Sequence, residues 1–134
     1  MARRLAEPRW LTRTVVDAIH TDLLREHGGL FGLRDENGLE AALARPRQQW
    51  HDDRTSDLAS LAAAYAFGIA GSHPYNDGNK RVAFVVMLTF LALNGIEFEA
   101  DDQDVLTTMI ALAAGRLSEA DLGDWLRGRI HPGE

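Results

Sequence analysis

The chain has 134 residues, of which 46% are apolar and 25% are charged, and its formal net charge is −6. These values are typical of a globular protein, so we predict a single domain over residues 1–134 with one hydrophobic core. The absence of cysteine excludes disulfides, zinc–thiolate sites and a cysteine nucleophile. The acidic balance argues against a general nucleic-acid-binding surface, and no direct nucleic-acid partner is expected.

The longest apolar run spans residues 82–93 and is interrupted only by Thr89. It is much shorter than the ~20 apolar residues of a transmembrane helix. The first residues contain no apolar run of the kind that marks a signal peptide. We therefore expect no membrane partner and a cytoplasmic location.

The N-terminal part predicts a loose arm over residues 1–11 and then a helix. Thr12 or Thr14 can cap this helix, Asp17 completes a capping box with Thr14, and Gly28-Gly29 ends it. Its apolar face follows helical spacing and comprises Val15, Val16, Ile19, Leu23 and Leu24.

A short helix over residues 38–44 is predicted next, with Asn37 as a possible cap and Pro46 as its interruption. The following segment, 47–54, is polar, and we expect it to be exposed and mobile. Its Trp50 is expected to pack against the core, with contact to a partner as the alternative.

Two apolar helices are predicted in the middle of the chain. Thr55 caps the first, which is rich in alanine and ends at Gly71. The second runs from Asn79 to about Leu93 and is apolar nearly all round, so other helices must surround it.

Beyond the central helix, residues 96–99 predict a brief extended piece. Asp101 or Asp102 caps the next helix, Ser118 opens the last one in a second capping box, and the tail 131–134 is predicted to be frayed. The pattern gives about six helices and no convincing strand pair. We therefore predict an all-α fold, a compact six-helix bundle around a buried central helix.

A polar stretch leads directly into this central helix, and it reads His73-Pro74-Tyr75-Asn76-Asp77-Gly78-Asn79-Lys80-Arg81. It places a helix N-terminus, with its unpaired N–H groups and partial positive charge, beside the core. An anion satisfies such a terminus. Two cations in the first helical turn are unfavourable on their own, and a bound polyphosphate supplies a reason for them.

Each polar residue of the stretch has a structural alternative. His73 is either a structural or surface residue, or a base that activates a hydroxyl. Asp77 either caps the helix or forms an Asx-turn, or it is a Mg²⁺ ligand. Lys80 and Arg81 are either a solvated basic pair or a phosphate-binding pair, for which Gly78 and Asn79 offer backbone amides. Tyr75 is expected to pack beneath the loop.

The stretch resembles the Fic motif, H-x-F-x-[D/E]-G-N-G-R-x-x-R, and more closely its Doc variant, H-x-F-N-D-x-N-K-R. The likeness to the Fic/Doc family extends over about residues 12–130 and implies a helical Fic fold. It implies that His73 is the general base and that Asp77 holds Mg²⁺. It also implies an anion hole and ATP phosphate site formed by Gly78, Asn79, Lys80 and Arg81. Segment 47–54 is placed near the flap that aligns target peptides in Fic proteins.

Two departures from the Fic pattern bear on the reaction. Lys80 replaces the second motif glycine, and Phe84 stands where Fic enzymes that transfer AMP have their second arginine. Doc-like proteins bind the nucleotide in reverse and transfer the γ-phosphate of Mg-ATP to a threonine of elongation factor Tu, which arrests translation. The resemblance thus implies a kinase toxin of a type II toxin–antitoxin system. Its partner would be a Phd-like antitoxin whose disordered tail folds onto this domain.

Two alternatives remain open at this point. One is a Fic-type nucleotidyl transferase that attaches AMP to a protein hydroxyl. The other is an inactive Fic-fold module that only binds a partner. No Ser or Thr is followed four residues later by Glu, so the inhibitory Ser/Thr-x-x-x-Glu segment of many Fic enzymes is not expected within the chain.

Overall fold

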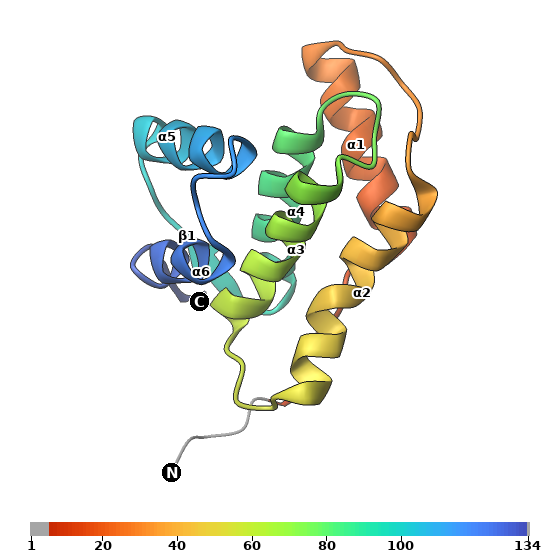
Figure 1. Ribbon diagram of the computed structural model, residues 1–134. Coiled ribbons are helices and arrows are strands. Elements are labelled where there is room, and N and C mark those ends of the chain that lie inside the picture. Colours follow the sequence, from red (N-terminus) through yellow and green to blue (C-terminus); the bar gives the residue numbers. More distant parts are fainter. Residues whose placement is uncertain (1–5, 134) are drawn as a thin grey trace.

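The computed structural model describes residues 6–133, which form six helices and two short strands (Figure 1). The all-α prediction is confirmed, with a small antiparallel strand pair added. No helix of the described residues is long and apolar enough to cross a membrane. The elements in chain order are α1 (Arg13–His27), α2 (Glu36–Asp52), α3 (Leu58–Ser72), α4 (Asn79–Leu93), β1 (Ile96–Phe98), α5 (Asp102–Ala113), α6 (Glu119–Arg127) and β2 (Ile130–Pro132).

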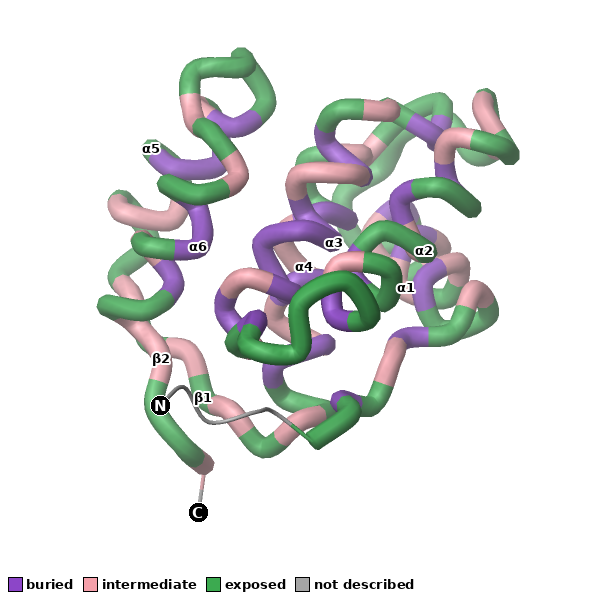
Figure 2. Tube along the Cα trace, turned by 60° about the horizontal axis from the view of Figure 1, so that its bottom comes forward, coloured by how far each residue is buried: buried purple, intermediate pink, exposed green. Residues whose placement is uncertain are grey.

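Helices α3 and α4 form the centre of the fold, and buried residues concentrate along both of them (Figure 2). Helix α3 packs against α2, α4, α5 and α6, whereas α4 packs against α1, α3, α5 and β1. Small residues bring α2 and α3 together, because a Cβ on Gly68 would lie only 3.2 Å from the Cα of Ala42. The predicted bounds of α4 are confirmed, although α3 is more completely enclosed.

The N-terminal arm is packed rather than loose from Arg9 onward. The ring of Trp10 stacks on Phe90 with centroids 5.8 Å apart. The backbone N–H of Leu11 donates to the hydroxyl of Tyr65 at 3.1 Å, and that of Arg9 donates to the side chain of Asn94 at 2.8 Å. These partners lie far along the chain, so no local pattern shows them. The first five residues of the predicted arm lie outside the described residues.

Helix α2 continues through Pro46, which corrects the prediction of a short helix and an exposed segment after it. An interior proline costs a helix ~3 kcal/mol. Here the turns on both sides of it share one buried face, which Leu39, Ala42, Pro46 and Trp50 form at helical spacing. Burial of that face holds the helix together across the proline. Its N-cap is Asp35, whose side chain accepts from the N–H of Gly38 at 2.8 Å, not Asn37.

The tail is paired instead of frayed. Strand β2 pairs antiparallel with β1, so that Ile96 lies opposite Pro132 and Phe98 opposite Ile130. The N–H of Gly133 then donates to the carbonyl of Gly95 at 2.7 Å. Each strand has only three residues and its partner is distant in the chain, so periodicity gives no signal. Residue 134 lies outside the described residues.

The caps of the remaining helices follow the predictions in part. Ser118 is the N-cap of α6, as predicted. Thr12 and Asp101 are the N-caps of α1 and α5, and Thr14 and Asp102, the other predicted candidates, are not. Helix α3 is capped by Asp57 rather than Thr55 and continues past Gly71 to Ser72. The Thr55 side chain is instead held by Asp53.

Replacing Asp57 with Asn should lower the free energy of unfolding in a pH-dependent way. Its carboxylate accepts from Nε of Arg127 at 2.7 Å, and this bond lowers the pKa of Asp57 from 3.8 to about 2. A lowered folded-state pKa gives stability that is present above pH 4 and lost as the pH falls toward 2. Because the pair is half exposed, we expect a loss of up to ~1 kcal/mol at pH 7.

Urea titrations of the wild type and Asp57→Asn at pH 7 and near pH 2 measure this effect. Asn is nearly as good an N-cap as Asp, so most of the difference should be lost near pH 2. An equal loss at both pH values would assign the effect to the cap and not to the ion pair with Arg127. Asp124→Asn is the matched control, since Asp124 contacts Arg127 at 2.6 Å without capping α3.

Candidate active site at the start of α4

The loop between α3 and α4 carries the motif, and the loop between α1 and α2 holds it in place. The carbonyl of Pro74 accepts from the backbone N–H groups of Arg34 and Asp35 at 2.7 and 2.9 Å. The N–H of Asn76 donates to the carbonyl of Gly32 at 3.0 Å. These bonds join the two loops edge to edge, so the motif has a fixed backbone before any ligand arrives.

Two glycines permit this close approach. A Cβ on Gly29, where φ is +128°, would lie 2.9 Å from Oδ2 of Asp77. A Cβ on Gly32, where φ is +115°, would lie 2.6 Å from Nδ2 of Asn76. Side chains at either position would push the loops apart. Gly29 follows the predicted end of α1, and it also makes room for the Asp77 carboxylate.

The side chain of Asn79 closes the motif loop on itself. Its Oδ1 accepts from the N–H of Tyr75 and its Nδ2 donates to the carbonyl of Tyr75, both at 2.9 Å. The Tyr75 side chain is buried, as predicted, and its hydroxyl donates to Asp17 at 2.8 Å. Burial and the neighbouring Asp17 carboxylate raise the pKa of Tyr75, which keeps this hydroxyl a donor. Only the backbone of Asn79 is therefore left for an anion.

Helix α4 begins without a side-chain cap. Gly78 occupies the N-cap position with φ +81°, and the first helical bond runs from the N–H of Val82 to the carbonyl of Gly78 at 2.9 Å. Within residues 6–133, the amides of Asn79, Lys80 and Arg81 have no hydrogen-bond partner. Three free N–H groups at the positive end of a helix dipole form an anion-binding arrangement.

An open pocket of about 410 Å³ lies over this helix end. The side chains of Lys80 and Arg81 are exposed, and neither forms an ion pair within the described part of the chain. The structure thus brings every residue of the predicted site to one pocket. Its lining consists of His73, Asn76, Asp77, Gly78, Asn79, Lys80 and Arg81.

His73 has a fixed backbone and an exposed side chain. It ends α3 with φ 47°, a left-handed conformation that is uncommon for a residue other than glycine. Its carbonyl accepts from Nη2 of Arg34 at 2.9 Å, and its N–H donates to the carbonyl of Ile69 at 3.1 Å. The imidazole has no hydrogen bond to another described residue, so it can receive a proton from a ligand in the pocket.

The Asp77 carboxylate organises its own turn. Oδ1 accepts from the N–H of Gly78 at 2.9 Å, and Oδ2 accepts from the N–H of Leu30 at 3.3 Å. The Asp77 side chain does not cap α4, so the prediction that Asp77 is a helix cap is wrong. No cluster of three or more His, Cys, Asp or Glu side chains within residues 6–133 has a metal-binding arrangement. Magnesium in nucleotide sites typically takes only one or two carboxylates plus phosphate oxygens, and the exposed carboxylate of Asp77 fits that requirement.

His20 of α1, which is not among the predicted site residues, also contacts the motif. Only 5% of its surface is exposed. Its Nε2 lies 3.0 Å from the carbonyl oxygen of Asp77, and its ring stacks on Tyr75 with centroids 3.7 Å apart. The missed signal was the spacing of Val16, His20 and Leu24, which places a histidine in the buried stripe of α1. Val15, assigned to that stripe, is 40% exposed instead.

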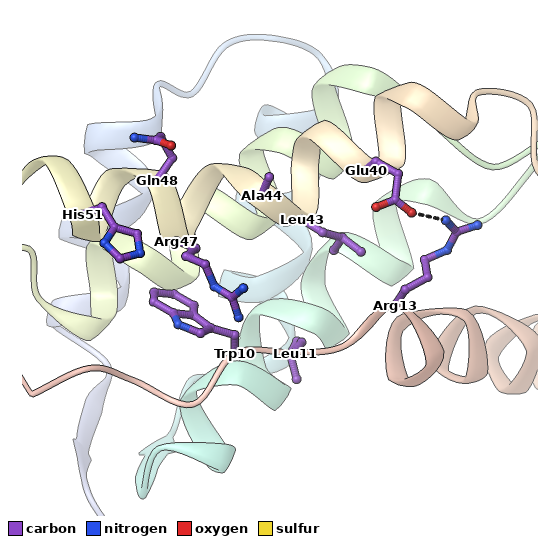
Figure 3. A pocket seen from close by; sticks show the side chains of 9 residues that line it. All are labelled: Trp10, Leu11, Arg13, Glu40, Leu43, Ala44, Arg47, Gln48 and His51. Carbon is purple, nitrogen blue, oxygen red and sulfur yellow. Dashed lines mark hydrogen bonds and ion pairs between the residues drawn. The ribbon is translucent and has the colours of Figure 1, made fainter.

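Segment 47–54 does not border this pocket, and its placement near a target-peptide flap stays a prediction. The start of α2 contacts the motif loop, and a helix of 17 residues is ~25 Å long, so its last turns lie at the far end (Figure 1). Arg47, Gln48 and His51 instead line a different pocket of about 350 Å³, between α2 and the segment that carries Trp10 (Figure 3).

Phe84, one turn further along α4, is not among the residues that line this pocket. It is half-buried and packs edge-on against Phe98 of β1, with ring centroids 6.0 Å apart. Among the residues that line the pocket, Lys80 and Arg81 carry the permanent positive charges, and the helix end adds its partial charge.

Known proteins resemble this chain over most of its length. Residues 10–91 match the model of the Fic/DOC family. The chain is 31% identical over 110 residues to "Protein kinase doc" of Escherichia phage P1, which covers 82% of this chain and 86% of that protein. It is 40% identical over 75 residues to "Toxin Doc" of Mycolicibacterium smegmatis, which covers 55% of this chain and 58% of that protein.

Among solved structures, the N-terminal Fic domain of a VirB-translocated Bep effector protein from Bartonella quintana, determined with bound ADP, aligns with a TM-score of 0.49. Its identity is 15%, and the alignment covers 81% of this chain and 54% of that one. The family assignment depends on the sequence matches, since the family model spans more than half of the chain and the phage relative aligns over most of both proteins. This protein belongs to the Fic/DOC family.

Proposed function

We propose that this protein is the toxin of a type II toxin–antitoxin system and acts as a protein kinase. It would transfer the γ-phosphate of Mg-ATP to a threonine hydroxyl of elongation factor Tu and so arrest translation in the cytoplasm. The observation that carries the proposal is the uncapped start of α4. There, three amides and two cations without partners among residues 6–133 share a pocket with His73. Two relatives whose names are "Protein kinase doc" and "Toxin Doc" support it.

The phosphate-binding role would fall to the first turn of α4. The amides of Asn79, Lys80 and Arg81 can donate to phosphate oxygens, and the dipole of the helix favours the negative charge. Arg81 offers a planar fork to two oxygens, while Lys80 acts as a point charge. Asp77 would hold Mg²⁺, which when bound supplies further neutralisation of the phosphate charge.

His73 would act as the general base. Its imidazole would take the proton of the target hydroxyl while the hydroxyl oxygen forms a bond to the γ-phosphorus. The bond between the γ-phosphorus and the β,γ-bridging oxygen then breaks, and ADP leaves with that electron pair. Phosphoryl transfer depends chiefly on positioning and charge neutralisation. This site supplies both through its fixed loops and its two cations.

Transfer of AMP is the second candidate, because it uses the same base and the same helix end. In that reaction the hydroxyl attacks the α-phosphorus and pyrophosphate leaves. Phe84 disfavours it: the resemblance to AMP-transferring Fic enzymes places an arginine there, whereas this side chain packs against Phe98. Lys80 in place of the second motif glycine disfavours it as well. An inactive binding module is the third candidate.

A Phd-like antitoxin is the proposed partner that restrains the toxin. Support comes from the two Doc relatives, since a toxin within a toxin–antitoxin module requires an antitoxin. Its disordered tail would fold on binding this domain.

A labelled-transfer assay tests the proposed reaction. The purified protein is incubated with elongation factor Tu, Mg²⁺ and ATP labelled either at the γ- or at the α-phosphate. We expect label from the γ-position only. Transfer of label from the α-position would show that the protein is a nucleotidyl transferase and not a kinase. A protein that transfers neither label, and whose melting temperature Mg-ATP does not raise, would be an inactive module.

A further inference from the structure

The peptide group between Asp77 and Gly78 leads into the N-cap residue of α4, and two contacts fix its orientation. Its carbonyl oxygen lies 3.0 Å from Nε2 of His20. Its N–H donates to Oδ1 of Asp77 at 2.9 Å. A carbonyl only accepts hydrogen bonds, so Nε2 of His20 carries the proton of this contact.

His20 is itself held in place. The residue is 5% exposed, and its ring lies almost parallel to the ring of Tyr75, with an interplanar angle of 11° and centroids 3.7 Å apart. Tyr75 in turn is tied to Asp17 by its hydroxyl and to Asn79 by its backbone. The donor from His20 therefore comes from a rigid part of the protein and directs the Asp77 carbonyl toward α1.

The neighbouring glycine makes the opposite orientation accessible. Gly78 has φ +81°, and glycine tolerates the conformations on both sides of a peptide flip at little energetic cost. A flip would turn the carbonyl away from α1 and toward the pocket that Asp77 and Gly78 line. It would place a partial negative charge beside the free amides of α4. It would also take the Gly78 N–H away from the Asp77 carboxylate.

We propose that His20 is a positioning residue that prevents this flip and so keeps the anion site at the start of α4 open. The inference rests on the proposed function for the identity of the anion, the phosphates of ATP. The affinity of the first turn of α4 for any polyphosphate would depend on a hydrogen bond from His20, a buried histidine that does not touch the ligand.

Two substitutions separate the hydrogen bond from the packing. His20→Phe keeps a buried ring that stacks on Tyr75 but has no donor. His20→Gln loses the ring but places an amide donor at similar reach. The probe is inorganic pyrophosphate, followed by isothermal titration and by the ¹H–¹⁵N signals of Gly78, Asn79 and Lys80.

We expect His20→Phe to weaken pyrophosphate binding by about 10-fold, the upper end of the range for loss of one hydrogen bond to a neutral carbonyl. The Gly78 amide signal should shift in the free protein, because it leaves the Asp77 carboxylate. His20→Gln should recover binding to within a few-fold of the wild type. A purely structural role would give the reverse order, since His20→Phe preserves the packing better.

Val16→Ala is the matched control. Val16 lies in the same buried stripe of α1 and is fully buried, so its truncation lowers stability without touching the Asp77 carbonyl. Its pyrophosphate affinity should be unchanged. If His20→Phe does not fold, His20→Leu replaces it as the variant without a donor.

The outcomes distinguish the two proposals. A wild-type protein that binds neither pyrophosphate nor Mg-ATP would contradict the proposed function. A wild-type protein that binds pyrophosphate, with equal affinity in the folded variant that lacks the donor, would overturn the role of His20 and leave the proposed function standing. Weak binding by His20→Gln together with tight binding by His20→Phe would overturn it as well.

Discussion

Replacing His73 with Asn should abolish phosphate transfer while leaving the fold and the nucleotide affinity close to those of the wild type. A general base contributes ~10²- to 10⁴-fold to the rate, and Asn cannot take its place because its amide is not a base at neutral pH. The imidazole is exposed and has no hydrogen bond to the described residues, so little stability depends on it.

Asn is preferred over Ala here because of the backbone. At φ 47° a residue other than glycine is strained, and Asn tolerates this region better than Ala does. His73→Ala should therefore lose the same activity and in addition ~1 kcal/mol of stability. Comparison of the two variants separates the lost base from the strained backbone.

Single-turnover transfer rates and cell-growth assays measure the effect. His131→Asn is the matched control, since His131 is exposed on β2, which pairs with the strand that follows the far end of α4. It should transfer at the wild-type rate. If His73→Asn remained toxic in cells and transferred phosphate normally, His73 would not be the base.

The parts of the site that were predictable from sequence are those that the chain builds locally. The polar stretch from His73 to Arg81 precedes an apolar run, so a helix N-terminus lined by those side chains follows from neighbouring residues alone. The bounds of α4 and the burial of Tyr75 follow in the same way. The capping residues Thr12, Asp101 and Ser118 are local features too.

What sequence reasoning missed depends on contacts between distant segments. His20 is 57 residues from the Asp77 carbonyl that it holds, and the pairing of β1 with β2 joins residues 96–98 to residues 130–132. The continuation of α2 through Pro46 depends on a buried face shared by the turns before and after the proline. All three features depend on tertiary contacts, and the spacing of residues along the chain does not show which distant segment makes each contact.

Replacing Arg81 with Ala should weaken the binding of Mg-ATP by ~10- to 100-fold, because hydrogen bonds to charged groups are each worth ~1.5–3 kcal/mol. Arg81 is exposed and has no carboxylate partner among the described residues, so its guanidinium is available to phosphate oxygens without breaking another contact. Arg81→Lys should recover only part of the affinity, since an ammonium restores the charge but not the two-pronged geometry. Stability should change little in either variant.

Isothermal titration of the wild type, Arg81→Ala and Arg81→Lys with Mg-ATP at low and high salt measures both contributions. The loss on going from Arg to Ala should shrink as salt increases, because added ions screen the exposed charge, while the difference between Arg and Lys should persist. Arg116→Ala is the control, since Arg116 is exposed and lies between α5 and α6, outside the pocket. If Arg81→Ala bound Mg-ATP as tightly as the wild type, the phosphates would not lie at the start of α4. The kinase proposal would then be unsupported, because it depends on phosphate binding at the start of α4.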